Sequence, residues 1–543
     1  MPRTLRLRPW QRHALTRFQA NSAPDFLAVA TPGAGKTTFA LTAARLTLPR
    51  LRGKLVIVAP TRHLKLQWAN AAEQFGLHLD PNWTPNEGLP PDVHGVVTTY
   101  QQASTAHTDL ARVCTEGFAI LDEVHHAGDD RAWGVGIDRS FGSARHRLAL
   151  SGTPFRSDDA LIPFLQYQNG QVLPDVEYGY GDALGDGGVV RPVYFPRFGG
   201  QMEWTAPDGA LLAASFEDPL PQSHANQRLK AALSVDGEWL ATVLSEANSQ
   251  LDLIRERTPD AGGLIIAIDQ EHAGQIFRLL RDRLGVQADV VVSEDPDASD
   301  KIERFAGNSQ PWVIAVRMIS EGVDIPRLRV GVYATTTTTE LFFRQAVGRI
   351  VRHTGGRGRA FMYVPDDPRL RHYANSIAET RRHQLDLFKK EREFNERAER
   401  AAGEEQMSLF AVHSATLTDA THEGDVEEAL QSELVEDCLP GDDQPLHDAP
   451  GLVLDLQALP PVDPSTRARP TVPGGRKERE RLRRINAVWV RDLVLATGLS
   501  HAQVNAELNR LSGVKRVSTA TAVELERRAA AAKSWHSRQL SVG

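Results

Sequence analysis

The chain has 543 residues, of which 41% are hydrophobic and 24% charged, and its net charge is −7. This length predicts three or four domains, each able to bury a core of its own. No apolar run approaches the roughly 18 residues of a membrane span, and the first ten residues lack the apolar centre of a signal peptide. Two cysteines, Cys114 and Cys438, are too few for a disulfide framework or a zinc site. We therefore expect a cytoplasmic protein with no membrane segment.

The net charge is unevenly distributed along the chain. Residues 403–450 hold thirteen acidic and no basic residues, so the rest of the chain carries a net charge of +6. From Arg476 to the end there are fourteen basic and six acidic residues, a net charge of +8. An acidic insert beside a basic terminal module is typical of proteins that contact nucleic acids.

Short apolar stretches alternate with helical patterns in the first 196 residues, which is typical of a parallel α/β sheet. The expected strands are 26–30, 54–59, 95–99, 117–121 and 147–150. After a glycine-rich segment the same alternation starts again. The strands expected there are 263–269, 290–292, 313–316, 330–334 and 360–364. This pattern predicts two similar α/β domains in series, residues 1–195 and 196–375, with a cleft between them.

A glycine-rich sequence, Ala30-Thr-Pro-Gly-Ala-Gly-Lys-Thr37, joins the first expected strand to a helical pattern. Such a turn points successive backbone N–H groups inward, where they can cradle phosphates. Lys36 would neutralise the β- and γ-phosphates of ATP, and the Thr37 hydroxyl would hold Mg²⁺. The loop departs from the usual Gly-x-x-x-x-Gly-Lys-Thr form because Ala30 takes the place of the first glycine. The residues expected to contact the nucleotide are Thr31, Pro32, Gly33, Ala34, Gly35, Lys36, Thr37 and Thr38.

An acidic sequence, Asp122-Glu-Val-His125, follows another apolar stretch. Its carboxylates are therefore expected at the carboxyl edge of the sheet, where α/β sheets bind ligands. Asp122 would reach Mg²⁺, and Glu123 would orient and deprotonate the attacking water, because a metal-bound carboxylate is not available as a base. The glycine-rich and acidic sequences together predict a site that hydrolyses ATP.

With further segments, these sequences resemble superfamily 2 helicases over residues 5–365. The resemblance is to the DEAD/DEAH-like branch that contains the helicase subunits of restriction enzymes and excision-repair helicases. It implies two tandem RecA-like domains. The additional matching segments are Leu7-Arg-Pro-Trp-Gln11, Val56-Ile-Val-Ala-Pro-Thr-Arg62, Val96-Val-Thr-Thr-Tyr100, Ser151-Gly-Thr-Pro154, Ser320-Glu-Gly-Val-Asp-Ile-Pro326 and Gln345-Ala-Val-Gly-Arg-Ile-Val-Arg352.

The resemblance assigns roles in the first domain. Gln11 would read the adenine edge, although Trp10 and Gln11 could instead simply open a helix. His125 would couple the ATP site to the second domain, the alternative being a histidine satisfied by hydrogen bonds at a strand end. Ser151 and Thr153 would sense the nucleotide state, because hydroxyl groups exchange hydrogen-bond partners readily. The residues expected to grip the sugar-phosphate backbone are Pro60, Thr61, Arg62, Thr98 and Thr99.

In the second domain the resemblance places Gly322 and Asp324 at the nucleotide. Gln345, Arg349 and Arg352 lie three or four apart and would share one face of a helix. The two arginines would act as fingers that stabilise charge on the γ-phosphate, an effect worth about 10³–10⁵ in rate in related phosphoryl transfers. The alternative is a solvated basic helix face. Gly348 argues against it, because a mid-helix glycine lowers helix stability without benefit to a plain surface helix.

The remaining sequence divides into three parts. Residues 376–402 are expected to form a charged helix, and 403–475 an acidic, proline-rich linker that cannot bury enough apolar surface to order itself. Residues 476–543 return to helical patterning. Within them Val488 to Leu511 is typical of a helix, a glycine turn and a second helix, as in a helix-turn-helix module. The basic residues near its expected contact face are Arg510, Lys515 and Arg516. A small helical bundle that binds protein is the alternative.

Two short sequences resemble the peptide by which bacterial proteins bind the DNA polymerase sliding clamp. The peptide would bury leucine and phenylalanine in a groove, with glutamine fixing the register. The copy Gln384-Leu-Asp-Leu-Phe388 falls in an expected helix, where its apolar residues would serve packing. The copy Gln406-Met-Ser-Leu-Phe410 borders the expected linker and is the candidate for a clamp contact.

We predict an ATP-dependent DNA helicase or translocase. Ser151-Gly152 is similar to the DNA-acting branch rather than to the Ser-Ala-Thr of RNA-acting relatives, so an RNA helicase is the first alternative. A second is the motor subunit of a restriction or defence complex with its nuclease on another chain, because the sequence shows no convincing nuclease constellation. A third is a non-enzymatic scaffold that binds nucleic acid and the clamp. The presence of Lys36, Glu123 and Arg349 disfavours a scaffold.

Overall fold

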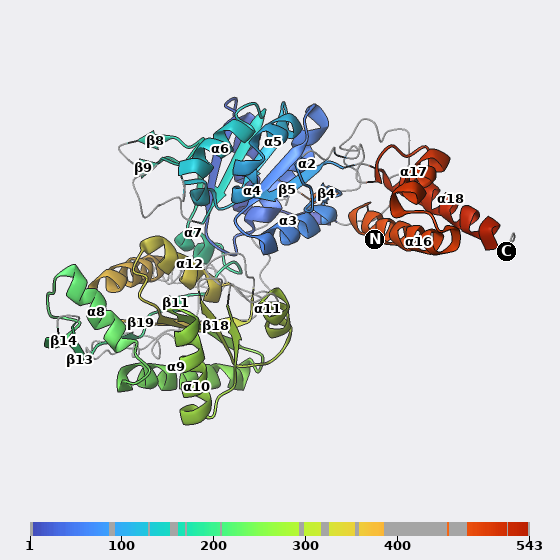
Figure 1. Cartoon of the computed structure of the whole chain (residues 1–543). Helices are drawn as coiled ribbons and strands as arrows, with labels where there is room; N and C mark the ends of the chain where they lie inside the picture. Colours follow the sequence, from blue (N-terminus) through green and yellow to red (C-terminus); the bar gives the residue numbers. More distant parts are fainter. Residues whose placement is uncertain are drawn as a thin grey trace, which may run out of the picture.

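The computed structural model describes most of the chain. The described residues are 4–85, 89, 93–128, 131–152, 161–168, 171–206, 209–292, 298–316, 325–352, 358–384, 453–455, 475–517 and 520–540. Figure 1 shows two domains built around sheets, one above the other, with a group of C-terminal helices beside the first. No helix in these ranges combines the length and hydrophobicity that crossing a membrane requires.

The first domain is built around a parallel sheet with strand order β10-β2-β7-β6-β3-β5-β4. The strands are β2 (Asp25–Ala30), β3 (Leu55–Ala59), β4 (Leu79–Asp80), β5 (Gly95–Thr99), β6 (Phe118–Leu121), β7 (His146–Ser151) and β10 (Val176–Tyr178). The helices are α1 (Pro9–Ala20), α2 (Lys36–Thr47), α3 (Arg62–Gln74), α4 (Tyr100–Thr105), α5 (His107–Cys114), α6 (Arg131–Phe141) and α7 (Tyr180–Gly185), with short 3₁₀ helices η1 (Leu48–Arg50) and η2 (Val124–Gly128).

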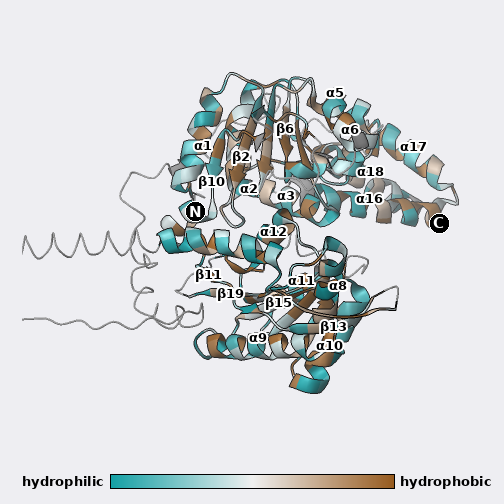
Figure 2. Cartoon of the chain, turned by 90° about the vertical axis from the view of Figure 1, so that its left-hand side faces the viewer, coloured by the Kyte–Doolittle hydropathy of each residue, from teal (hydrophilic) through white to brown (hydrophobic). Residues whose placement is uncertain are grey.

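Alternate residues of these strands enter two separate cores. Phe26 and Ala28 of β2 join the cluster that packs against α1, α2 and α3. Leu27 and Val29 join the cluster formed with α4, α5 and α6. Because a parallel sheet is covered on both faces, its strands read as continuous apolar runs. This is why the strands were visible in the sequence, and Figure 2 shows both sheets as mainly hydrophobic.

The second domain repeats this construction. Its parallel sheet has the order β11-β19-β18-β15-β17-β16, with β12 also paired to β19. The strands are β11 (Val193–Tyr194), β12 (Arg197–Phe198), β15 (Gly262–Ala267), β16 (Ala288–Val291), β17 (Trp312–Val316), β18 (Leu328–Ala334) and β19 (Ala360–Pro365). The helices are α8 (Gln222–Ala232), α9 (Glu238–Arg257), α10 (Gln270–Leu284), α11 (Ala298–Gly307) and α12 (Glu340–Ile350), and residues 368–384 are also helical.

The predicted fold class is confirmed, and each strand expected in the two sheets has a counterpart. Some short strands were not expected. One is β10, which pairs with β2 at the edge of the first sheet. Others form the hairpins β8 (Tyr167–Gln168) with β9 (Gln171–Val172) and β13 (Gln201–Thr205) with β14 (Leu211–Ser215). Within the range expected to lack structure, β20 (Val453–Asp455) pairs antiparallel with β1 (Thr4–Arg6).

The C-terminal helices are α16 (Gly475–Thr497), α17 (His501–Ser512) and α18 (Ala522–Leu540). Gly498 adopts φ +69° in the turn between α16 and α17, so the expected helix, glycine turn and helix are confirmed. Two small apolar clusters lie within this helical region and include residues of the segments that connect the helices. The buried Arg528 guanidinium donates hydrogen bonds to side-chain oxygens of three asparagines, namely Asn486, Asn505 and Asn509.

Candidate active site between the two sheet domains

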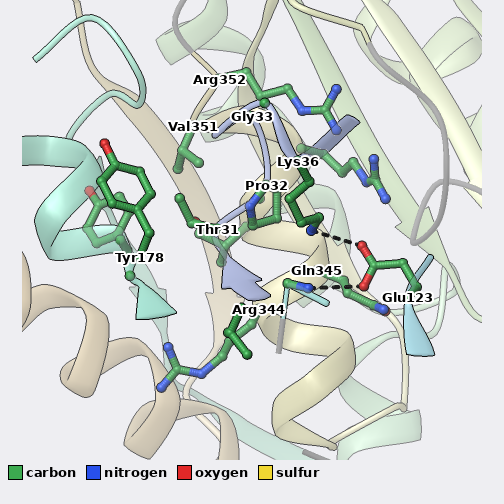
Figure 3. Close-up of a pocket in the computed structure, with 18 of the residues that line it drawn as sticks. Thr31, Pro32, Gly33, Lys36, Glu123, Tyr178, Arg344, Gln345, Val351 and Arg352 are labelled. Carbon is green, nitrogen blue, oxygen red and sulfur yellow. Dashed lines mark hydrogen bonds and ion pairs between the residues drawn. The ribbon is translucent and has the colours of Figure 1, made fainter. Parts of the chain in front are cut away.

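A cavity of about 670 Å³ lies where the two sheet domains meet. Its walls come from the glycine-rich loop after β2, the acidic sequence after β6, the strand β10, and helix α12 of the second domain. Figure 3 shows the loop residues Thr31 to Lys36 in its centre, with Glu123 on one side and Tyr178 on the other. Cavities of this size take small molecules.

Of the predicted site residues, those that line the cavity are Thr31, Pro32, Gly33, Gly35, Lys36, Thr37, Asp122, Glu123, Gln345, Arg349 and Arg352. Ala34 and Thr38 belong to the same loop and helix but do not line it. Thr153, Gly322 and Asp324 lie outside the described residues. The clamp-like sequence Gln406–Phe410 also lies outside the described residues, as do residues 385–388 of the other clamp-like sequence.

The glycine-rich loop adopts a conformation that its sequence requires. Gly33 and Gly35 have φ of +83° and +89°, a region that residues with side chains rarely enter. A Cβ atom at Gly35 would come within 2.6 Å of Nε2 of Gln11. Helix α2 begins directly after the loop at Lys36, which leaves the first N–H groups of the helix without partners inside it.

Three successive carbonyls of the loop are held from outside by helix α1 and the residue that precedes it. These hydrogen bonds run from Arg8 Nη1 to Gly33 O at 2.8 Å, from Trp10 Nε1 to Ala34 O at 3.0 Å, and from Gln11 Nε2 to Gly35 O at 2.9 Å. Because these carbonyls are hydrogen-bonded on the side away from the cavity, the loop can turn its N–H groups toward the cavity. The sequence Leu7 to Gln11 therefore supports the loop directly.

Gln11 is buried and does not line the cavity. Its Oε1 accepts a hydrogen bond from the Arg8 backbone N–H at 2.8 Å, while its Nε2 donates to the loop. Gln11 also lies in the first turn of α1, as the helix-opening alternative expected. Both functional groups of the amide are thus engaged by the protein. Adenine reading by Gln11 stays a prediction.

Lys36 and Glu123 form an ion pair across the cavity, with Nζ and Oε1 3.0 Å apart. The other carboxylate oxygen accepts hydrogen bonds from the Gly152 N–H at 3.0 Å and the Ser151 hydroxyl at 3.4 Å. Burial by itself raises the pKa of Glu123. Electrostatic attraction by Lys36 and His125, with the hydrogen bonds from Gly152 and Lys36, outweighs burial and lowers the pKa of Glu123 below its usual range. Glu123 is therefore an ionised group that Lys36 neutralises.

Asp122 is held differently from its neighbour. It is buried, and its Oδ2 accepts a hydrogen bond from the Trp68 indole N–H at 2.7 Å. Its backbone carbonyl accepts another from the Tyr100 hydroxyl at 2.9 Å. Burial and then repulsion by Glu123 raise the pKa of Asp122 above its usual range. A buried carboxylate with a raised pKa gains from a nearby cation, as a metal-binding role requires.

His125 connects the acidic sequence to the second domain. Its Nδ1 lies 3.7 Å from Glu123 Oε2 and 3.3 Å from the Ser151 hydroxyl oxygen. The Gln345 side-chain amide from α12 reaches Nε2 of the same ring at 3.5 Å. A single buried imidazole therefore touches the acidic sequence, the end of β7 and the second domain. A coupling role for His125 stays a prediction.

Helix α12 approaches the glycine-rich loop at one glycine. A Cβ atom at Gly348 would lie 2.4 Å from Cγ of Pro32. The mid-helix glycine is thus explained by close packing against the loop. Arg349 lies next to it and lines the cavity, as predicted.

One expectation about this region was wrong. Helix α12 ends at Ile350, so Arg352 does not share a helix face with Gln345 and Arg349. Arg352 lies in extended chain that bridges to Val190, and the Arg191 guanidinium donates a hydrogen bond to its carbonyl. Its side chain nonetheless lines the cavity, and a Cβ atom at Gly33 would lie 3.3 Å from its Cγ.

The sequence missed cavity residues that come from β10, α7 and α12. Tyr178 stacks on Trp10 with ring centroids 5.2 Å apart, and its hydroxyl donates to Asp186 at 2.7 Å. Burial, then Asp186, raises the pKa of Tyr178, so the hydroxyl stays protonated. Tyr180 and Arg344 also line the cavity. The edge strand β10 is only three residues long, so its alternation of buried and exposed residues is too short to be detected as a strand.

The residues predicted to grip nucleic acid lie at the amino ends of α3 and α4. Arg62 is exposed, and Pro60 and Thr61 are partly exposed. The Thr61 and Thr99 side chains cap α3 and α4 by accepting hydrogen bonds from Leu64 N and Gln102 N. The prediction for Thr98 was wrong, because its side chain is fully buried in a strand covered on both faces.

Comparison with known proteins adds three findings. Residues 4–156 match the family described as "Type III restriction enzyme, res subunit". An uncharacterized protein of Mycobacterium tuberculosis is 45% identical over 389 residues, covering 70% of this chain and 64% of that protein. A protein of Halobacterium salinarum whose name proposes a DNA 3'-5' helicase, Rad25, is 25% identical over 343 residues, 61% of this chain and 49% of that protein.

The predicted resemblance to superfamily 2 helicases is confirmed. The chain spans less than two thirds of the length of the mycobacterial relative. Among solved structures, a fragment of an HsdR subunit of a type I restriction enzyme from Vibrio vulnificus aligns with a TM-score of 0.48 at 18% identity. That alignment covers 67% of this chain and 65% of the fragment.

Proposed function

We propose that this chain hydrolyses ATP and uses the reaction to move along DNA, as a helicase or translocase. One observation carries the proposal. A glycine-rich loop with Lys36, the acidic pair Asp122 and Glu123, and the arginines Arg349 and Arg352 of the second domain all line one cavity. A phosphate-binding loop, a base and arginine fingers are the parts that nucleoside triphosphate hydrolysis needs.

The loop suits a triphosphate for reasons visible in its backbone. Gly33 and Gly35 take up conformations that bring N–H groups together, and a side chain at Gly35 would collide with Gln11. Thr37 and Asp122 would hold Mg²⁺, which, when bound, offsets phosphate charge. The donor set of one hydroxyl and one buried carboxylate is of the oxygen type that this ion prefers.

Glu123 is suited to act as the base because its pKa depends on Lys36. In the present arrangement Lys36 is the main cation that lowers the pKa of Glu123. When Lys36 turns to a phosphate group instead, the pKa of Glu123 rises and the carboxylate becomes a stronger base. Gly152 and Ser151 would keep that carboxylate in place for the attacking water.

The choice of DNA rests on Ser151-Gly152 and on the DNA helicase name of the Halobacterium relative. An RNA helicase is the alternative within the same mechanism. A second candidate function is the motor subunit of a restriction complex, which the family description of residues 4–156 supports. A nuclease on a separate subunit stays a prediction. Sliding-clamp binding through Gln406–Phe410 and a cytoplasmic location stay predictions.

The test is ATP hydrolysis measured without nucleic acid and with single-stranded DNA, duplex DNA and RNA. The wild type is compared with Lys36→Ala and Glu123→Gln. We expect DNA to stimulate hydrolysis, Glu123→Gln to abolish turnover while retaining nucleotide binding, and Lys36→Ala to weaken both. Stimulation by RNA alone would favour the RNA helicase. Hydrolysis that appears only when a second subunit is added would favour the restriction-complex motor.

A further inference from the structure

Asp122 is held by residues from helices α3 and α4, and α3 also lines the cavity with Leu64 and Gln67. Trp68 of α3 donates its indole N–H to Oδ2 at 2.7 Å, and Tyr100 of α4 donates its hydroxyl to the backbone carbonyl at 2.9 Å. Both rings are buried, with 2% and 1% of their surface exposed. Hydrogen bonding of one carboxylate oxygen fixes the rotamer and presents the other oxygen to a ligand.

These two helices begin at the segments proposed to grip nucleic acid. Thr61 caps α3, and the exposed Arg62 is its first residue. Thr99 caps α4, whose first residue is Tyr100 itself. Lys65 of α3 donates a hydrogen bond to Gln102 of α4 at 3.3 Å, which joins the two helices near their amino ends.

We infer that Trp68 and Tyr100 are positioning residues that transmit nucleic-acid binding to Asp122, Trp68 through the carboxylate and Tyr100 through the backbone carbonyl. The inference rests on the proposed function and concerns how nucleic acid would regulate the ATP site. Arg62 and Trp68 are six residues apart on one helix, a rise of about 9 Å. Because a helix moves as a rigid element, a shift of α3 at Arg62 also shifts the indole against Asp122.

A purely structural role for Trp68 is the competing explanation, since its ring also packs in the core of the first domain. The chain offers a matched control. Trp312 in β17 of the second domain is equally buried and donates its N–H to the Asn248 side chain at 2.9 Å. Replacing either tryptophan by phenylalanine removes one buried hydrogen bond and similar ring volume, but only Trp68 touches Asp122.

The experiment compares full-length wild type, Trp68→Phe and Trp312→Phe. The first readout is the affinity for a fluorescent ADP analogue in Mg²⁺ and in EDTA, without nucleic acid. The second is the factor by which a single-stranded oligodeoxynucleotide stimulates ATP hydrolysis. Coupling of this kind typically amounts to about 5–150-fold. We expect Trp68→Phe to reduce both the Mg²⁺-dependent gain in affinity and the stimulation factor by at least about fivefold, with affinity in EDTA unchanged.

Trp312→Phe should leave both readouts within about twofold of wild type, which is the scatter expected for a residue outside the site. Equal stimulation of Trp68→Phe and wild type would overturn the inference. An equal loss of stimulation in Trp68→Phe and Trp312→Phe would also overturn the inference, because such a loss would reflect reduced stability alone. If Trp68→Phe does not fold, Tyr100→Phe decides the matter, since it keeps the ring and removes the hydrogen bond from the hydroxyl to the Asp122 backbone carbonyl. Undiminished stimulation in Tyr100→Phe would then overturn the inference.

Failure of the proposed function gives a different result. If the wild type hydrolyses ATP at the same rate with and without nucleic acid, the proposed movement along DNA is contradicted. The inferred role of Trp68 and Tyr100 then fails as well. A wild type that responds to DNA, combined with a Trp68→Phe variant that responds equally, would contradict the inference alone.

Discussion

The two walls of the cavity are built in different ways. On the first-domain side, the loop is fixed by hydrogen bonds to successive carbonyls, and Lys36 is paired with Glu123. On the second-domain side, α12 meets the loop through close packing of Gly348 against Pro32, and Gln345 meets His125 through a 3.5 Å contact. Under the proposed function, this difference predicts that the first domain binds phosphate by itself. The second domain would then supply positive charge only when α12 lies against the loop.

Among the variants that test this difference between the two walls, Arg349→Ala should have the largest effect. If the second domain contributes to the transition state rather than to binding, the turnover rate should fall by about 10³-fold while ADP affinity changes by less than about threefold. Stopped-flow phosphate release and ADP titration measure the two quantities. Equal losses in affinity and rate would mean that Arg349 belongs to the binding wall, and the proposed division of roles would be incorrect.

Gly348→Ala tests the contact between the walls. The added Cβ would lie 2.4 Å from the Pro32 ring, so the loop or α12 must move. A displacement of about 1 Å near reacting groups can cost about 100-fold in rate, and we expect a loss of this order. The control is Gly274→Ala in α10, where a Cβ meets nothing within 4 Å. There, alanine should stabilise the helix by about 0.8 kcal/mol and leave turnover unchanged. The opposite ranking of the two variants would show that Gly348 is not a packing contact.

The parts of this site that the sequence predicted are those encoded by contiguous residues. Lys36 and Thr37 follow a buried strand, and the acidic pair follows another, so parallel strand order brings them to one edge. The strands themselves were predictable because they are buried on both faces and therefore uniformly apolar.

The parts that the sequence did not predict depend on contacts between distant segments. Tyr178 joins the site through a short edge strand paired with β2. The bond from Trp68 to Asp122 spans 54 positions of sequence. Thr98 has the residue type of a phosphate ligand, but its place in a central strand buries it. Arg352 keeps helical spacing from Arg349, yet α12 has already ended. Residue type and spacing do not reveal such cases, because burial and helix ends depend on packing.

Gln11→Ala tests how the first-domain wall of the cavity is built. Its expected effect is the smallest of these variants. Gln11 bonds to the Gly35 carbonyl and to the Arg8 N–H, and each bond contributes about 1 kcal/mol. If its main role is to support the loop, affinity for ATP and for GTP should both fall, by up to about 30-fold, because the phosphates are common to both. If Gln11 instead reads adenine, ATP affinity should fall and GTP affinity should not. Titration with both nucleotides distinguishes the roles. The paired amide in this structure favours support of the loop, since reading adenine would first require breaking its bond to Gly35.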